Sequence, residues 1–80
     1  MPTAIVLASV AQGEIDAAVD GLSTLDDVTE VYSVAGEYDL VAKVQVEDYE
    51  RFADVIPERL QSVPGIEGTE TLMAFKTYRF

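Results

Sequence analysis

A glycine followed by acidic and aromatic side chains marks the part of this sequence with the clearest chemical capacity. The run Gly36-Glu37-Tyr38-Asp39-Leu40 is a turn signal that opens directly into an apolar strand pattern. Backbone N–H groups around a glycine turn can donate to a carboxylate, and the Asp39 carboxylate can pair with an ammonium group. An α-amino acid carries both charges. Alternatively, Gly36 supplies a positive φ in a hairpin and Asp39 hydrogen-bonds the turn backbone.

A second polar group lies near the end of the chain, after Pro64-Gly65-Ile66. Thr69 and Thr71 are two residues apart in a strand-like segment, so both hydroxyls point to the same side of a sheet. They can add polar contacts to a bound molecule from a neighbouring subunit. Alternatively, they are interface residues first, because threonine is a good strand former.

Apolar periodicity predicts the elements that position these residues. Alternating or β-branched runs predict strands, and apolar residues that recur every three or four positions predict amphipathic helices. Alternation places Val28, Glu30 and Tyr32 on one face of the second strand, opposite Thr29 and Val31, and it gives the third strand one wholly apolar face. The expected strands are residues 4–8, 28–35, 38–47 and 66–75, and the expected helices are residues 14–26 and 49–63.

The second expected helix carries a start signal, an internal proline and a stop signal. Asp48 is placed to cap its N-terminus, and Pro64-Gly65 ends it. Pro57 removes one helical hydrogen bond, so we expect a kink or a tightened turn while the helix continues. Its apolar stripe is expected to comprise Tyr49, Phe52, Ala53, Ile56, Leu60 and Val63.

The element order βαββαβ contains an internal repeat. Aligning Val6 with Val44 places strand on strand and helix on helix along the chain. Two βαβ units predict one α+β domain over residues 1–80 with the ferredoxin-like fold, in which two helices cover one face of a four-stranded antiparallel sheet. The other face is expected to expose Val41, Lys43 and Gln45 together with Thr69, Thr71, Met73 and Phe75.

The small size of the chain predicts association. A domain of 80 residues buries only roughly 60% of the surface that its unfolded chain exposes, so a single copy is marginally stable. Cysteine is absent, so no disulfide compensates. We therefore expect a homo-oligomer in which a partner subunit covers the open sheet face, as in a dimeric α+β barrel. The aromatic tail of Phe75, Tyr78 and Phe80 is expected to cover an apolar seam.

The charge of the chain argues against some partners. Fifteen acidic residues against five basic ones give a net charge of −10, and this opposes direct binding to nucleic acid. No apolar run approaches the roughly 20 residues of a membrane span, and no signal peptide pattern opens the chain. A soluble cytoplasmic protein that contacts neither membrane nor nucleic acid is the default expectation.

The order and spacing of these motifs resemble a known family. The motifs are the run from Val31 to Leu40 around Gly36, a capped helix, Val63-Pro64-Gly65-Ile66 and Thr69-Glu70-Thr71. Together they resemble the C-terminal effector domain of the Lrp/AsnC family, which is also called the RAM domain, for regulation of amino-acid metabolism. Full-length members place a helix-turn-helix before this domain. Here the first strand begins within a few residues of Met1, so the resemblance implies a stand-alone effector domain.

The resemblance implies an assembly and a ligand site. Family members form dimers through their sheets and then rings, here octamers or decamers, with amino acids held at the seams between dimers. The ligand would shift this assembly or act on a full-length Lrp/AsnC regulator and so control transcription or amino-acid metabolism. The family reads a ligand side chain from the outer face of the second helix, where Val55 and Arg59 are expected. The implied ligand-binding residues are Gly36, Glu37, Tyr38, Asp39, Leu40, Val55, Arg59, Thr69 and Thr71.

Other functional classes stay open as alternatives. Cofactor-free enzymes also use dimeric ferredoxin-like barrels, but they usually need a group that titrates near neutrality, and histidine and cysteine are both absent. Asp39, Glu70 or a tyrosine would have to serve, so we expect no enzyme. No calcium-loop pattern is present, and neither a metal nor a cofactor is expected. A pure assembly module without a ligand, which mixes subunits with a full-length regulator, is the remaining alternative. For Arg59 itself, the alternative to a role in ligand selectivity is a surface charge that answers Glu58 or Asp54.

Overall fold

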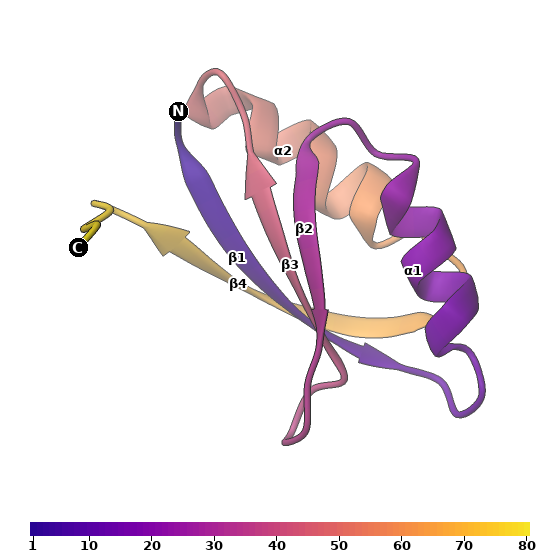
Figure 1. Ribbon diagram of the computed structural model, residues 1–80. Helices are drawn as coiled ribbons and strands as arrows, with labels where there is room; N and C mark the ends of the chain where they lie inside the picture. The colour runs from indigo at the N-terminus through magenta and orange to yellow at the C-terminus, as the bar shows by residue number, and fades with distance from the viewer.

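A computed structural model describes all residues, 1–80, as one antiparallel sheet with a layer of helices on one face (Figure 1). The sheet has four strands in the order β2-β3-β1-β4, so the predicted ferredoxin-like βαββαβ fold is confirmed. The elements are β1 (Thr3–Val10), α1 (Ile15–Ser23), β2 (Val28–Ser33), β3 (Leu40–Gln45), η1 (Tyr49–Arg51), α2 (Phe52–Asp54), η2 (Val55–Leu60) and β4 (Ile66–Ala74).

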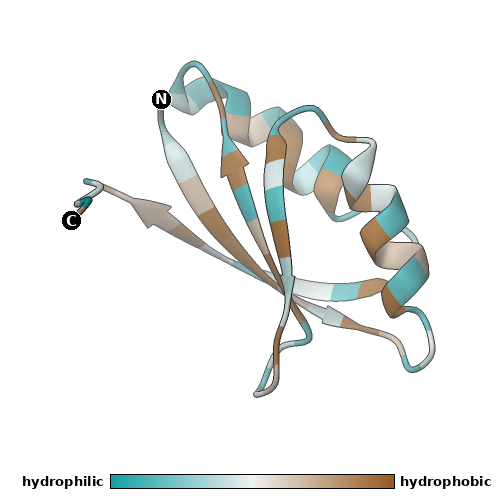
Figure 2. Cartoon of the chain, in the orientation of Figure 1, coloured by the Kyte–Doolittle hydropathy of each residue, from teal (hydrophilic) through white to brown (hydrophobic).

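The hydrophobic core lies between the sheet and the helices. Figure 2 shows apolar residues in the strands and in the helices that cover them. Because successive side chains of a strand point to opposite faces, every second side chain of β1 and β3 enters the core, as predicted for β3. From the helical layer, Leu22 and Leu60 pack into the same cluster. The buried apolar residues are Ala4, Val6, Ala8, Ala18, Leu22, Leu40, Ala42, Val44, Val46, Phe52, Val55, Ile56, Leu60 and Val63.

The strict alternation predicted for β2 is wrong. Val28 pairs with Val44, but Glu30 pairs with Lys43, so a bulge at Thr29 shifts the register. An extra residue in one strand reverses the facing of everything after it. As a result Val28 and Val31 both pack against the core, whereas Glu30 does not.

The second helical segment begins where predicted, but Pro57 has a different effect. The Asp48 carboxylate accepts a hydrogen bond from the Arg51 N–H, which confirms the predicted N-cap. The segment then runs through a 3₁₀ turn, one α-helical turn and the wider π-helical turns of η2, which contain Pro57. The chain therefore continues past the proline by widening its turn, where we expected a kink or a tightened turn.

No helix has the length and apolar character needed to cross a membrane.

One sheet face carries no helix, as predicted, but β4 contributes different residues to it. In β1, Ala4, Val6 and Ala8 point into the core, and they pair with Met73, Thr71 and Thr69. Paired residues share a face, so the predicted placement of Thr69, Thr71 and Met73 on the uncovered side is wrong. Phe75 lies in a bend beyond the end of β4, so strand pairing does not assign it to either face. This uncovered side is called the open face below. It comprises Ile5, Leu7, Glu30, Tyr32, Val41, Lys43, Gln45, Glu70, Leu72 and Ala74.

Candidate functional site

The glycine turn connects β2 to β3 and closes a hairpin, as predicted. Its loop extends past the end of the sheet (Figure 1), and the Val34 N–H donates to the Asp39 carbonyl at 3.0 Å across its base. Gly36 has φ +144°, a backbone conformation that residues with a side chain rarely adopt. A Cβ at Gly36 would meet no atom within 4 Å, so the backbone conformation, not space, requires glycine here.

Asp39 fastens the turn to the end of β1. Its Oδ2 accepts a hydrogen bond from the Val10 N–H at 2.8 Å, and its own N–H donates to the Ala8 carbonyl at 2.9 Å. The carboxylate therefore binds a backbone group, as in the alternative to ligand binding, but this group belongs to β1 and not to the turn itself. The other carboxylate oxygen, Oδ1, receives no hydrogen bond from the chain. Asp39 thus combines a structural contact with one oxygen that a ligand could use.

Tyr38 reaches from the turn to β4 on the open face. Its hydroxyl donates to Glu70 Oε1 at 2.8 Å. This hydrogen bond to the Glu70 carboxylate raises the pKa of the Tyr38 hydroxyl above its ordinary value of 10.0, with smaller contributions from desolvation and from the negative charges of Glu70 and Glu37. A hydrogen bond to the neutral phenol favours the protonated form.

Replacing Glu70 with glutamine is expected to lower the pKa of Tyr38 towards 10. Because the pKa in the folded state lies above that in the unfolded state, this contact stabilises the fold at neutral pH, and the contribution is lost as the pH rises above 10. Absorbance titration of tyrosinate in both proteins would measure the shift. Glu67→Gln, at an exposed β4 position without a hydrogen bond, should leave the curve unchanged. Superimposable wild-type and Glu70→Gln curves would contradict the prediction.

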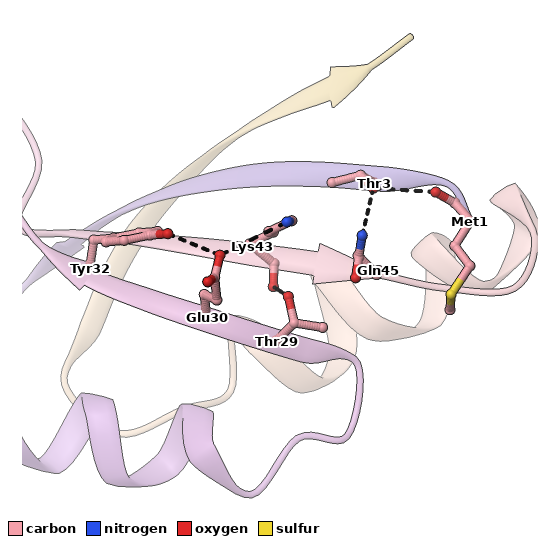
Figure 3. Close-up of polar contacts among 7 residues, drawn as sticks. All are labelled: Met1, Thr3, Thr29, Glu30, Tyr32, Lys43 and Gln45. Atoms are coloured by element: carbon pink, nitrogen blue, oxygen red, sulfur yellow. Dashed lines mark hydrogen bonds and ion pairs between the residues drawn. The ribbon is translucent and has the colours of Figure 1, made fainter. Parts of the chain in front are cut away.

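A set of hydrogen-bonded polar side chains lies on β2 and β3 of the open face (Figure 3). The Tyr32 hydroxyl donates to Glu30 Oε1 at 2.9 Å, and this bond, followed by the charge of Glu30 and by desolvation, raises the pKa of Tyr32. Lys43 Nζ lies 3.9 Å from the same carboxylate oxygen. Gln45 on β3 also donates to the Thr3 hydroxyl at 3.3 Å. These pairs leave few unpaired charges among the apolar side chains of the open face.

The threonines lie at the same end of the sheet as the turn but on its helical side. Thr69 pairs with Ala8, and Ala8 pairs with Leu40, so these residues form one row across three strands. Adjacent strands are about 4.8 Å apart, so Thr69 lies two strand spacings from the start of β3. The Thr69 hydroxyl accepts a hydrogen bond from Gln61 Nε2 at 3.1 Å. Thr71 follows on the same face, opposite Val6.

Two residues of η2 belong to the predicted site, and the predicted position of one of them is wrong. Val55 is 0% exposed and belongs to the core, so its predicted position on the outer face is wrong. Arg59 is exposed, as predicted. It makes no ion pair, so the alternative in which Arg59 pairs with Glu58 or Asp54 finds no support.

The surface has two hollows, and neither includes a predicted site residue. One, of about 290 Å³, lies between the start of β1 and the end of β4. The other, of about 330 Å³, lies between α1 and β2 and is lined by Val19, Ser23, Val28, Thr29, Glu30 and Val31. No three acidic side chains come together in a group that could hold a metal ion. A single chain therefore presents the turn as an open surface, not as a closed cavity.

Sequence reasoning missed the residues that hold the turn. Val10 and Ala8 bind Asp39, and Glu70 binds Tyr38. Each partner lies about thirty residues away along the chain, and two of the three contributions come from backbone atoms, which leave no mark on residue type. The hollow beside β2 was also missed; the bulged residue Thr29 is among its lining residues.

The chain is similar to proteins of one family along almost its whole length. A family model described as the Lrp/AsnC ligand binding domain matches residues 3–79. The HTH-type transcriptional regulator FL11 of Pyrococcus horikoshii is 30% identical over 76 residues, which are 95% of this chain and 50% of that protein. The FL11 regulators of three Pyrococcus species match this chain, and the chain spans about half the length of each of them.

Solved structures give the same result. The crystal structure of TTHA0845 from Thermus thermophilus is 42% identical, has a TM-score of 0.90 and covers 100% of both chains. The transcriptional regulator NMB0573 of Neisseria meningitidis, solved as a complex with L-Met, has a TM-score of 0.88, is 15% identical, and covers 99% of this chain and 53% of its own. That identity shows a shared fold alone. On the family match, this chain belongs to the Lrp/AsnC family and forms its ligand-binding domain.

Proposed function

We propose that this domain oligomerises through its open face and binds an amino acid or a related small metabolite at an interface between copies. Binding would regulate transcription or amino-acid metabolism through a DNA-binding relative. The proposal is supported by FL11, an HTH-type transcriptional regulator of which this chain matches half. It is also supported by the complex of NMB0573 with L-Met, a protein of the same fold.

One observation at the turn carries the ligand proposal. The backbone N–H groups of residues 35–38 donate to no acceptor within the chain, and Asp39 Oδ1 accepts from no donor. Unpaired N–H groups can donate to the carboxylate of an amino acid, and the free oxygen of the Asp39 carboxylate can accept from its ammonium. Because the turn is exposed in one chain, a second copy would have to complete the site. Thr69, Thr71 and Arg59 are surface groups that such a neighbour could contribute; Val55 is not, because it is buried.

The enzyme alternative receives little support. Neither hollow contains Asp39 or Glu70, the carboxylates that would have to act as acid or base. The pKa of Tyr38 and of Tyr32 moves away from neutrality, which makes each a weaker acid. The relatives are regulators of transcription. A ligand-responsive domain without catalytic activity is therefore the better proposal.

Calorimetry against the standard amino acids would test the ligand proposal. We expect heat with one or a few of them, and an affinity about tenfold or more lower for Asp39→Asn, because hydrogen bonds to charged groups contribute about 1.5–3 kcal/mol. Asparagine keeps an oxygen for the Val10 N–H, so this variant changes the charge and preserves the turn. Glu67→Gln serves as the control for loss of an exposed acid. Heat with no amino acid would remove the effector role and leave the assembly role.

A further inference from the structure

Three negatively charged side chains lie at the glycine turn. Glu37 is an exposed residue within the turn, and Asp39 follows it with the free Oδ1 described above. Glu70 joins them from β4, because its carboxylate accepts the hydrogen bond from Tyr38. The charges of Glu37 and Glu70 both reach the Tyr38 hydroxyl, where they help to raise its pKa. Each of the three carboxylates therefore belongs to the turn or to the contact of the turn with β4.

Two of the five basic residues are held in ion pairs elsewhere. Lys43 Nζ lies 3.9 Å from Glu30 Oε1, and Lys43 itself is about 10 Å along β3 from Leu40, the first residue of that strand. Arg51 Nη2 lies 3.2 Å from Asp27 Oδ2. Neither ion pair includes a carboxylate of the turn, so these basic side chains leave its charge uncompensated.

The other basic residues also lie away from the turn. β4 ends at Ala74, which pairs with Thr3 at the end of the sheet opposite to the turn. Lys76 and Arg79 follow that end, and Figure 1 shows the C-terminus well away from the loop between β2 and β3. Arg59 lies in η2, on the helical side of the sheet. Within one chain, the carboxylates of the turn therefore have no basic partner.

A neighbouring copy adds to this negative charge. The proposed ligand site needs a second copy, and each copy carries a net charge of −10. The potential at a seam between two such copies is the sum of their charges, so it is negative. The guanidinium of Arg59 from the neighbour would offset one of the three carboxylates. A bound molecule with a net positive charge is therefore favoured there over a neutral or a negative one.

We propose that the turn selects an α-amino acid with a basic side chain, lysine or arginine, and that Glu37 pairs with the cation of this side chain. The inference rests on the proposed function and deepens it, since it names the class of ligand. The α-carboxylate meets the unpaired backbone N–H groups of the turn, and the α-ammonium meets Asp39 Oδ1. Glu37 makes no ion pair within the chain, so it is free for the second cation.

The spacing of the two acidic residues suits a ligand with two cations. Glu37 and Asp39 are two residues apart, so their Cα atoms are separated by at most about 7 Å. The flexible chain between the two ammonium groups of lysine can span a similar distance. The Asp39 carboxylate is held by its hydrogen bond to β1, whereas that of Glu37 is exposed and can adjust to the length of the side chain.

Calorimetry with matched pairs of ligands would test the selection. Norleucine has the carbon skeleton of lysine without its ammonium group, and citrulline is the neutral counterpart of arginine. In the wild type, we expect the basic member of at least one pair to bind about fivefold more tightly than its neutral counterpart, the upper range for an exposed ion pair, because the other carboxylates add to the attraction. L-Glutamate should bind more weakly than either. The preference should shrink as salt is added.

The variant Glu37→Gln assigns the preference to one side chain. Glutamine keeps the size and polarity of this exposed residue, and the affinity ratio within the pair should fall by about twofold or more. The affinity for the neutral member should stay unchanged, whereas a purely structural role of Glu37 would lower both affinities together. Glu50→Gln is the matched control, because it removes an exposed carboxylate from η1, near the other end of the sheet, and should leave the ratio unchanged.

The outcomes separate this inference from the proposed function. A preference for the basic ligand that falls in Glu37→Gln and persists in Glu50→Gln supports it. An uncharged or acidic amino acid that binds as tightly as lysine and arginine would overturn the selection and leave the effector role standing. A basic preference that Glu37→Gln leaves intact, or that Glu50→Gln lowers equally, would overturn the role of Glu37. Binding of no amino acid would overturn the effector role, and the inference with it.

Discussion

Replacing Leu60 with alanine is expected to lower the free energy of unfolding by about 2–5 kcal/mol. Leu60 is fully buried at the end of η2, where it packs into the cluster formed by β1, β3 and α1. Truncation removes buried methyl groups and leaves a cavity that the packed strands cannot fill by small movements. Small domains have total stabilities of about 5–15 kcal/mol, so this loss is a large fraction of the whole.

Urea denaturation followed by circular dichroism would measure the change at one fixed protein concentration, since association also contributes to stability. Met73→Ala is the matched control, because Met73 is 39% exposed and its truncation should cost less than about 1 kcal/mol. Equal denaturation midpoints for the wild type and Leu60→Ala would show that the core does not lie where the structure places it.

Replacing Leu72 with aspartate is expected to dissociate the proposed oligomer into monomers. Leu72 is 49% exposed in a single chain and lies opposite Ile5 on the open face. If a second copy covers this face, the new carboxylate is buried without a partner, which costs about 3–5 kcal/mol. The net charge of −10 on each copy adds repulsion, so dissociation should be most complete at low salt. Light scattering would report the mass.

The neighbouring residue supplies the control for this experiment. Met73 is the next residue of β4 and faces the helical side. Met73→Asp introduces the same charge on the same strand and should leave the open-face pairing intact. A wild type that is monomeric, or a Leu72→Asp variant with unchanged mass, would refute association through the open face.

The error in β4 shows which information the sequence lacks. The two alternating series of this strand, one with Thr69, Thr71 and Met73 and the other with Glu70 and Leu72, are about equally apolar. Composition therefore could not decide which series faces the helices. The register with β1 decides it, and that pairing joins residues at opposite ends of the chain. In β3 the two series differ strongly in polarity, and there the prediction was confirmed.

The error at Val55 has a different cause. The predicted stripe assumed the spacing of a regular α-helix through Pro57. In η2 the turn is wider, with hydrogen bonds from each residue to the fifth before it, such as that from Gln61 N–H to the Ile56 carbonyl. Residues five apart then share a face, so Val55 is buried together with Leu60. A proline signals that regular geometry ends, but not which geometry replaces it.

The predictions that depend on neighbouring residues in the sequence were confirmed. The cap at Asp48 and the hairpin around Gly36 depend on residues within a few positions of each other, and both were confirmed. The bulge at Thr29 and the bond from Val10 to Asp39 depend on distant partners, and neither was predicted. Sequence reasoning therefore found the candidate turn but not what holds it.

The three hydrogen bonds made by Asp39 through its carboxylate, its N–H and its carbonyl join the end of the loop to β1 and to Val34, the residue after β2. A loop fixed in this way has already lost much of its conformational entropy during folding. A molecule that arrives there meets a preorganised surface, and less of its binding free energy is spent on ordering the loop. Recognition at this turn should therefore resemble a rigid fit more than a disorder-to-order transition.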